Sequence, residues 1–301
     1  MRSHGKRKAV LLSLLALVLA AGAAEGVYVP RYLTDRPTFD ITSAADPDAI
    51  TVMSANVRCF SPLDLFKKSW FYRAKLIVEN VRASAPDLIG FQEVTPMHYA
   101  YLTETLRGYA SVIEYRDRSP LREGCPVFYN TAKFTLTQQG SFWLSETPEV
   151  MSKSWGAAFN RVCSYVLLTE KASCKTLAVF NTHLDHISDA ARIGGINVIL
   201  DKLESFGNVP CILMGDLNAV EDSETYRAAT GRFLDAKYAA PDTDSGATFQ
   251  KWGKRLDDEN IDYFMISKTG IVPLSYKVVR TTYDGVYPAD HFPIEMTCRL
   301  A

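Results

Sequence analysis

The 301-residue sequence lacks several features that mark particular protein classes. It has no fixed-period repeat and no low-complexity stretch, so nothing indicates a solenoid or an array of small units. No linker divides it, and we therefore expect one domain near the upper size limit of a single hydrophobic core. The formal net charge is only −1, so the chain as a whole does not indicate a surface that tracks polyanions.

Cysteine is sparse, and its spacing indicates no metal site. The six cysteines include no C-x-x-C pair of the kind that holds zinc. Cys163 and Cys174 fall on two runs that are able to form a hairpin, which makes them the one candidate disulfide. Cys211 lies in an apolar run typical of a buried strand, and buried free thiols are the alternative for all six.

The N-terminus has the layout of a signal peptide. Four basic residues, at positions 2, 6, 7 and 8, precede an apolar and small-residue run from Ala9 to Ala24. That run is shorter than the roughly 20 residues of a spanning helix, and we expect cleavage near Ala23 or Ala24. An uncleaved membrane anchor is the alternative. Both predict a secreted or extracytoplasmic protein, and removing residues 1–24 changes its formal charge from −1 to −5.

Beyond residue 24 we expect an irregular surface lead-in over residues 25–49 and one folded domain over residues 50–301. Strand-like runs alternate with helical patterns in that domain, which is typical of an α/β fold. Two mixed β-sheets packed face to face, with helices on both outer faces, give a four-layer sandwich. The helices are expected at 69–83, 97–106, 188–206 and from about 223. The strands are expected at 51–57, 87–91, 110–115, 126–130, 134–144, 161–169, 175–183, 210–214, 260–266, 274–280 and 291–297.

Most of these predicted strands begin or end at a residue that carries an amide, a carboxylate or an imidazole. Polar groups gathered at neighbouring strand ends form a site. The residues concerned are Asn56, Gln92, Glu93, Asn181, His183, Asp185, His186, Asp216, Asn218, Asp262, Asp290 and His291.

Six short motifs built from these residues occur in the order typical of the endonuclease/exonuclease/phosphatase superfamily, which the chain resembles from about residue 50 to 297. They are Asn56, Gln92-Glu93, Asn181-Thr182-His183, Gly215-Asp216-Leu217-Asn218, Ile261-Asp262-Tyr263 and Asp290-His291-Phe292-Pro293. Each motif alone is weak, but six in order are specific. The run Phe142 to Pro148, with Trp155, Arg161 and Glu123, is similar to a bacterial, often exported branch of metal-dependent hydrolases.

The resemblance implies a deoxyribonuclease-like fold and metal-dependent hydrolysis of phosphate esters. It implies Asn56, Glu93 and Asp290 as metal ligands, an oxygen-rich set that suits Mg²⁺ or Mn²⁺. His183 and His186 also raise the idea of zinc, but no thiol accompanies them and the other candidates are carboxylates, which argues against it.

The resemblance also implies the roles of the remaining residues. Asp216 orients or deprotonates the attacking water, with Asn218 beside it. His291 contacts the scissile phosphate, and Asp262 holds its other ring nitrogen. His183 stabilises charge in the transition state. Arg161 and Asn181 are expected to bind substrate.

Simpler interpretations exist for single residues. Glu93 and Asp216 are each placed to cap a following helix, and Arg161 and Glu123 to form a structural ion pair. For the whole protein, a phosphodiesterase acting on nucleic acid is the first hypothesis. A phosphomonoesterase or a sphingomyelinase-like hydrolase of phospholipid head groups is the second, and an inactive cell-surface binding module is the third. No obligate protein partner is indicated, and we expect membrane association only if the N-terminal segment is retained.

Overall fold

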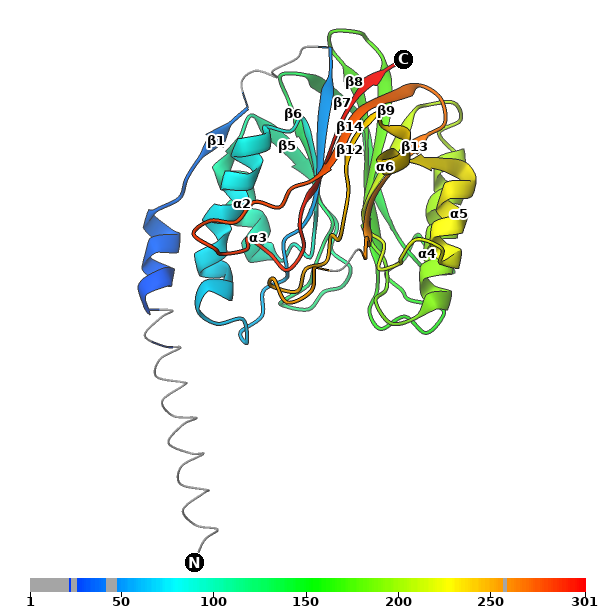
Figure 1. The fold of residues 1–301 in the computed structure, drawn as a ribbon. Coiled ribbons are helices and arrows are strands. Elements are labelled where there is room, and N and C mark those ends of the chain that lie inside the picture. The colour runs from blue at the N-terminus through cyan, green and yellow to red at the C-terminus, as the bar shows by residue number, and fades with distance from the viewer. Residues whose placement is uncertain (1–21, 23–25, 42–47, 257–258) are drawn as a thin grey trace, which may run out of the picture.

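The computed structural model describes residues 22, 26–41, 48–256 and 259–301 (Figure 1). The predicted signal peptide or anchor over residues 1–24 therefore lies, except for Gly22, outside the described residues. Within the described part of the chain, no helix has the length and apolar character needed to cross a bilayer.

Two β-sheets form the centre of the molecule. The seven-stranded sheet has the order β12-β14-β15-β2-β3-β6-β5, and the six-stranded sheet has the order β11-β13-β10-β9-β8-β7. The strands of the first are β2 (Ile50–Asn56), β3 (Leu88–Gln92), β5 (Tyr109–Val112), β6 (Val127–Asn130), β12 (Asp242–Asp244), β14 (Ile271–Val278) and β15 (Ile294–Leu300). Those of the second are β7 (Phe134–Trp143), β8 (Val162–Glu170), β9 (Thr176–His183), β10 (Cys211–Asp216), β11 (Phe233–Asp235) and β13 (Asp262–Ser267).

Helices cover the outer face of each sheet. On the seven-stranded sheet lie α2 (Trp70–Ser84) and α3 (Pro96–Thr105), and on the six-stranded sheet lie α4 (Asp189–Glu204) and α5 (Glu224–Arg232). The four-layer α/β sandwich expected from the sequence is thus confirmed. Shorter elements are η1 (Phe66–Lys68), α6 (Ala236–Ala239) and a parallel pair of β1 (Phe39–Asp40) with β4 (Leu106–Arg107).

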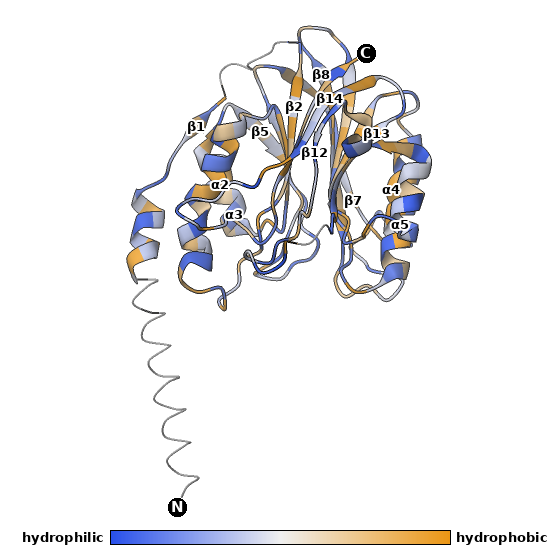
Figure 2. Cartoon of the chain, in the orientation of Figure 1, coloured by the Kyte–Doolittle hydropathy of each residue, from blue (hydrophilic) through white to orange (hydrophobic). Residues whose placement is uncertain are grey.

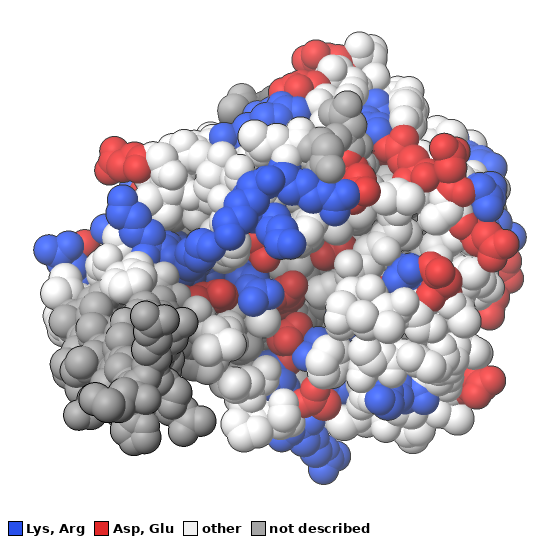
Figure 3. Space-filling model, turned by 60° about the horizontal axis from the view of Figure 1, so that its bottom comes forward, with Lys and Arg blue, Asp and Glu red and all other residues white. Residues whose placement is uncertain are grey.

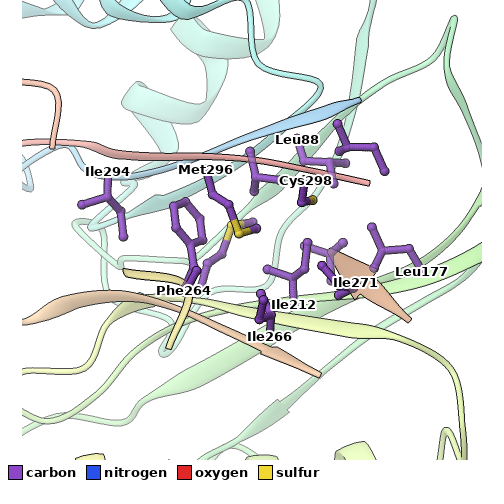
Figure 4. Packing of buried hydrophobic residues seen from close by; sticks show 14 of the residues in the cluster. Leu88, Leu177, Ile212, Phe264, Ile266, Ile271, Ile294, Met296 and Cys298 are labelled. Atoms are coloured by element: carbon purple, nitrogen blue, oxygen red, sulfur yellow. The ribbon is translucent and has the colours of Figure 1, made fainter. Parts of the chain in front are cut away.

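The largest apolar cluster fills the space between the two sheets (Figure 4). Successive strand side chains point to opposite faces, so every second residue enters this layer. In β10, Ile212 and Met214 enter it, while Cys211 and Leu213 pack under the outer helices. Figure 2 shows the result: apolar colour concentrates on the strands, and the helices carry polar residues on part of their surface.

Two expectations differ from the structure. The expected irregular lead-in is helical over residues 26–34, and Tyr32 within it is buried, stacked on Tyr101 at 4.9 Å between ring centroids. The candidate Cys163–Cys174 disulfide is absent from the described residues: Cys163 is buried in β8, Cys174 lies exposed in the turn after it, and both thiols are free. All six cysteines are free thiols, and four of them are buried as the alternative predicts, whereas Cys59 is half-buried and Cys174 is exposed.

Candidate active site

The candidate site continues the layer between the two sheets. In β2, Ile50 and Val52 point into that layer, and the same alternation carries Asn56 to its end. The inward positions of the neighbouring strands supply the other groups in the same way. They are Gln92 of β3, Asn181 and His183 of β9, Asp216 of β10 and Asp262 of β13. The apolar core thus ends in a polar layer at one edge of the sandwich.

Asn56 connects the two sheets through its amide. Its Nδ2 donates to Glu93 Oε1 and to Asp216 Oδ2, both at 3.0 Å, and its Oδ1 accepts from the Arg58 N–H at 3.0 Å. The amide nitrogen rather than the oxygen therefore faces the two carboxylates. Its role as a metal ligand stays a prediction, and the structure adds that Asn56 holds the two carboxylates in place.

Glu93 has a left-handed backbone, with φ of 62°, which is a costly conformation for a residue with a Cβ. Its carboxylate also accepts a 2.6 Å hydrogen bond from the Cys59 N–H. Burial by itself would raise the pKa of Glu93, but the nearby His183, this bond, the Asn56 amide and the charge of His291 together outweigh burial and hold it below its usual value. Glu93 is therefore an ionised carboxylate at neutral pH. It does not cap α3, whose N-cap is Thr95.

His291 lies between two carboxylates. Its Nδ1 is 2.9 Å from Asp262 Oδ2, the contact expected from the sequence, and its Nε2 is 3.7 Å from Asp216 Oδ2. Burial lowers the pKa of His291, but the charge of Asp262, its hydrogen bond, and the charges of Asp216 and Asp290 together raise that pKa to about 10. The imidazole is therefore protonated across the neutral range.

Asp216 is the base candidate of the site. Burial and the charge of Asp262 raise its pKa to about 7, against the opposing effects of His291 and of two hydrogen bonds, from the Asn218 N–H and the Asn56 amide. The alternative that Asp216 caps α5 is wrong, because the N-cap of that helix is Ser223.

His183 Nε2 lies 3.5 Å from Asp216 Oδ2. Burial and the nearby Arg161 hold the pKa of His183 well below its usual value. His183 is therefore a neutral hydrogen-bonding group at neutral pH, whereas His291 is a cation, so the two imidazoles differ in charge.

A divalent cation fits the carboxylates at one end of the site. Asp290 Oδ1 is buried and has no hydrogen-bond partner among the described residues, and burial raises the pKa of Asp290 against the lowering effect of His291. Glu93 lines the same cavity, so a hard cation held by oxygen ligands would satisfy both carboxylates. Asp216, Asp262 and His291 also place ligand atoms within 4.8 Å of one another. Glu93 and Asp290 would suit a cation better than this second group, because the Nδ1 of His291 is already bonded to Asp262.

A cavity of about 360 Å³ opens beside these residues, and Arg116 and Arg161 form one wall of it, whereas Arg58 lies 3.9 Å from Asp290. Arg161 is 5% exposed, contacts His186 Nδ1 at 3.0 Å and lies 3.6 Å from Asp185. Arg116 holds Glu123 with two hydrogen bonds of 2.9 and 2.8 Å. The predicted ion pair between Arg161 and Glu123 is therefore replaced by two separate pairs.

Phe159 completes this wall and is 45% exposed. The Arg116 guanidinium lies 4.4 Å from its ring centroid, and the His186 ring stacks on it at 5.9 Å. Burial and Glu93 raise the pKa of Glu123 to about 7. The wall is thus cationic and aromatic.

The structure brings most of the predicted site residues to this cavity. Glu93, Arg161, His183, Asp216, Asn218, Asp290 and His291 line it, and Asn56 and Asp262 stand directly behind these residues. Asn181 does not reach it. Its Nδ2 donates to the carbonyls of Phe91 and Pro126, each at 2.8 Å, and its Oδ1 accepts from Gln92, so its amide joins the two sheets.

Sequence reasoning missed five residues of the cavity: Arg58, Cys59, Arg116, Phe159 and Phe249. Arg58 and Cys59 follow the motif residue Asn56 by two and three positions, which is a signal that could have found them. The other three lie in long connections between strands, where no short motif or periodicity marks them.

Comparison with known proteins is consistent with this geometry. A family model described as "Endonuclease/Exonuclease/phosphatase family" matches residues 53–291. An uncharacterized protein of Acanthamoeba polyphaga mimivirus is 30% identical over 159 residues, which cover 50% of this chain and 59% of that protein. The CCR4-Not complex 3'-5'-exoribonuclease subunit Ccr4 of Emericella nidulans is 25% identical over 188 residues, which cover 52% of this chain and 27% of that protein. The chain thus spans between about a quarter and three fifths of the length of these two curated relatives.

Solved structures match over nearly their whole length. A mannosyl-6-phosphatase of Bacteroides thetaiotaomicron is 29% identical, with a TM-score of 0.75 over 83% of this chain and 99% of that one. A protein of unknown function from Enterococcus faecalis is also 29% identical, with a TM-score of 0.77 over 84% and 100%. The catalytic domain of human Nocturnin, at 20% identity, 86% and 97% coverage and a TM-score of 0.67, shares the fold.

Proposed function

Because this chain belongs to the endonuclease/exonuclease/phosphatase family, we propose that it hydrolyses phosphate esters with the help of a divalent cation, Mg²⁺ or Mn²⁺. One observation carries the proposal: Asp290, whose buried Oδ1 has no hydrogen-bond partner among the described residues, lines the same cavity as the ionised Glu93 and as His291, which Asp262 holds from behind. Buried carboxylates with unsatisfied oxygens are costly unless a cation or a proton compensates them. The resemblance stated from the sequence is confirmed at the level of the family.

In the proposed mechanism Asp216 accepts the proton of the attacking water. Its raised pKa of about 7 leaves it partly ionised and sufficiently basic at neutral pH, which is the range that suits a general base. Asn218 donates its backbone N–H to Asp216 Oδ1 and so fixes the carboxylate. Water then attacks in line with the leaving oxygen.

His291 and His183 are proposed to act on the phosphate oxygens. His291 donates from its protonated ring, which Asp262 orients, and His183 donates as a neutral imidazole. Arg161 adds a positive charge from the opposite wall. A bound cation would supply further positive charge at the phosphate and at the leaving oxygen.

For the substrate, we favour a phosphomonoester of a small organic alcohol. A cavity of about 360 Å³ is near the lower end of small-molecule pockets, which favours a compact ester. The mannosyl-6-phosphatase that is similar over most of this chain supports the same class. The exposed Phe159 ring offers an apolar face for the organic group.

A phosphodiesterase acting on nucleic acid, the first hypothesis from the sequence, is the second candidate. The relatives named as exoribonuclease subunits support it. Export of the chain, with or without its N-terminal segment, also remains a proposal, which fractionation of cells producing the tagged full chain would test.

The test is a turnover assay with the purified protein and Mg²⁺, Mn²⁺ or EDTA. Substrates would be sugar phosphates, p-nitrophenyl phosphate, bis-(p-nitrophenyl) phosphate, RNA and single-stranded DNA. We expect cation-dependent release of phosphate from monoesters, and its loss in Glu93→Gln. Cation-dependent cleavage of RNA or DNA alone would favour the second candidate, and turnover that EDTA leaves intact would refute the proposal.

A further inference from the structure

Exposed apolar side chains gather at the end of the molecule where the cavity opens. Five connections meet there, which we call the mouth loops: residues 57–69, 113–126, 144–161, 184–188 and the described part of 245–261. They carry Leu63, Leu121, Val150, Phe159, Ile187 and Leu256, all at least 45% exposed. Leu63 is 85% exposed, which is a large apolar area for water to cover.

The opposite end of the same sandwich provides an internal comparison. Its turns, residues 131–133, 171–175, 205–210 and 268–270, contain no exposed large apolar side chain among the described residues. Both ends consist of loops between the same strands, so loop chemistry in general does not explain the difference. Apolar patches that persist on a protein surface mark contact sites.

Lysines accompany the apolar side chains on two of the mouth loops. Lys67, Lys251 and Lys254 are exposed, and the Lys68 ammonium lies 5.3 Å from the ring centroid of Trp252, which joins the two loops. Figure 3 shows Lys and Arg gathered in a band across this end of the molecule. On a chain whose total formal charge is −1, the loop 57–69 carries three basic residues and one acid, Asp64, so this mouth loop is locally basic.

We propose that the mouth loops dock on an anionic lipid bilayer. Aliphatic side chains that enter the interface together with lysines that contact anionic headgroups are the two components of peripheral membrane binding. A nucleic acid backbone would use the lysines but would gain little from Leu63 or Leu256. The cavity opens among these loops, so docking places it against the headgroup layer.

The path of the chain is consistent with this orientation. Helix 26–34 packs on α2 through Tyr28 with Tyr72 and Tyr32 with Phe71, and Phe71 in turn contacts Phe60 of the first mouth loop. The first residues of that helix lie toward the end where the mouth loops meet (Figure 1). Helix 26–34 therefore begins on the side that we expect to face the bilayer (Figure 1).

The experiment compares binding of the full chain to vesicles of phosphatidylcholine and of a phosphatidylcholine–phosphatidylglycerol mixture. The test variants are Leu63→Asp and the pair Lys67→Glu with Lys251→Glu, and the matched control is the pair Lys171→Glu with Lys175→Glu at the opposite end. Residues 1–24 are common to all variants. Each lysine near an anionic surface strengthens binding roughly fivefold, so we expect the test pair to weaken binding to the mixed vesicles by about 25-fold or more. The control pair should bind as the wild type does.

A fluorescent label distinguishes docking of the loops from binding through the N-terminal segment. A solvent-sensitive dye on Leu63→Cys, in a Cys174→Ser background, should shift to the blue on mixed vesicles. The same dye on the native exposed Cys174 of the opposite end should not shift. No shift at position 63, or equal binding by the test and control pairs, would overturn the proposal.

Two further measurements separate the alternatives. If the test pair lost affinity for RNA but kept its affinity for vesicles, the mouth loops would be a nucleic-acid surface and the proposal would fail. Docking does not rest on the proposed hydrolysis, so Glu93→Gln should bind vesicles normally whether or not the wild type has activity. Leu63→Asp should keep the turnover of a soluble ester, which shows that its site is folded.

Discussion

At the scale of single residues, His291 depends on Asp262 for both its orientation and its charge. Asp262 Oδ2 accepts a 2.9 Å hydrogen bond from His291 Nδ1, which leaves His291 Nε2 directed toward Asp216 and the cavity. Two further carboxylates, Asp216 and Asp290, add to the field that keeps the ring protonated. Asp262, which lies behind the cavity, therefore determines the protonation and orientation of His291, which lines it.

We predict that Asp262→Asn lowers kcat/KM by about 100-fold at neutral pH and moves the active pH range to lower pH. The pKa of His291 is raised to about 10, so its proton is present at all lower pH values and is lost as pH rises through 10. Without the charge and hydrogen bond of Asp262 the pKa of His291 falls, so the alkaline limb of the pH profile should move down, and the acid limb should follow because Asp262 also raises the pKa of Asp216. Asp201→Asn, an exposed change on α4, is the control, and an unmoved alkaline limb would contradict the assignment.

Replacing Asn181 would show whether this residue has a structural role or contacts the substrate. Its amide donates to the buried carbonyls of Phe91 and Pro126, and Asn181→Ala would remove both hydrogen bonds, leaving the Pro126 carbonyl only the Phe91 N–H at 3.2 Å. Each lost partner costs about 1–3 kcal/mol, so we expect the free energy of unfolding to fall by roughly 2–5 kcal/mol. Urea unfolding measures this change. A variant of wild-type stability with a raised KM would instead support the contact with substrate predicted from the sequence.

At the scale of strands, two glycines allow a matched test of how closely neighbouring strands approach. Gly215 in β10 has φ of 139°, and a Cβ there would lie 2.0 Å from the Thr182 carbonyl oxygen. Gly231 in α5 has nothing within 4 Å of the same position. We predict that Gly215→Ala prevents folding or lowers Tm by more than about 10 °C. Gly231→Ala should gain about 0.5–1 kcal/mol, because alanine is the better helix former. Similar Tm values for the two variants in thermal unfolding would contradict this account.

The strands that build the site were predictable, and the wall opposite them was not. Continuous apolar runs locate β2, β9 and β10, and the two-residue repeat of a strand carries the polar residue at the end of each onto the inward face. Arg116 and Phe159 lie in irregular connections whose course depends on contacts distant in sequence, such as the 4.4 Å approach of one to the other. Short edge elements such as β1 and β11 carry too few residues for a period to show.

At the scale of the whole molecule, the domain includes residues that sequence reasoning assigned to a lead-in. Helix 26–34 contributes Tyr32 to the cluster between α2, α3 and the seven-stranded sheet, and β1 pairs with β4. The Arg36 guanidinium lies 5.3 Å from the Tyr32 ring and 5.5 Å from the Tyr101 ring. This segment therefore extends the core across one side of the sandwich, and a chain beginning near Glu25 would retain it.

We accordingly predict that a chain starting at Ala49 is much less stable than one starting at Glu25, although both contain every residue of the candidate site. Tyr32 stacks on Tyr101 and meets Phe71 edge-on at 5.3 Å, so its loss exposes both rings. Tyr32→Ala tests the same contacts at full length and should cost about 3–5 kcal/mol in urea unfolding. Val27→Ala, a half-exposed position on the same helix, should change stability by less than about 0.5 kcal/mol. If both shortened chains unfolded at the same urea concentration, the segment would be a lead-in after all, and the folded domain would begin near residue 50.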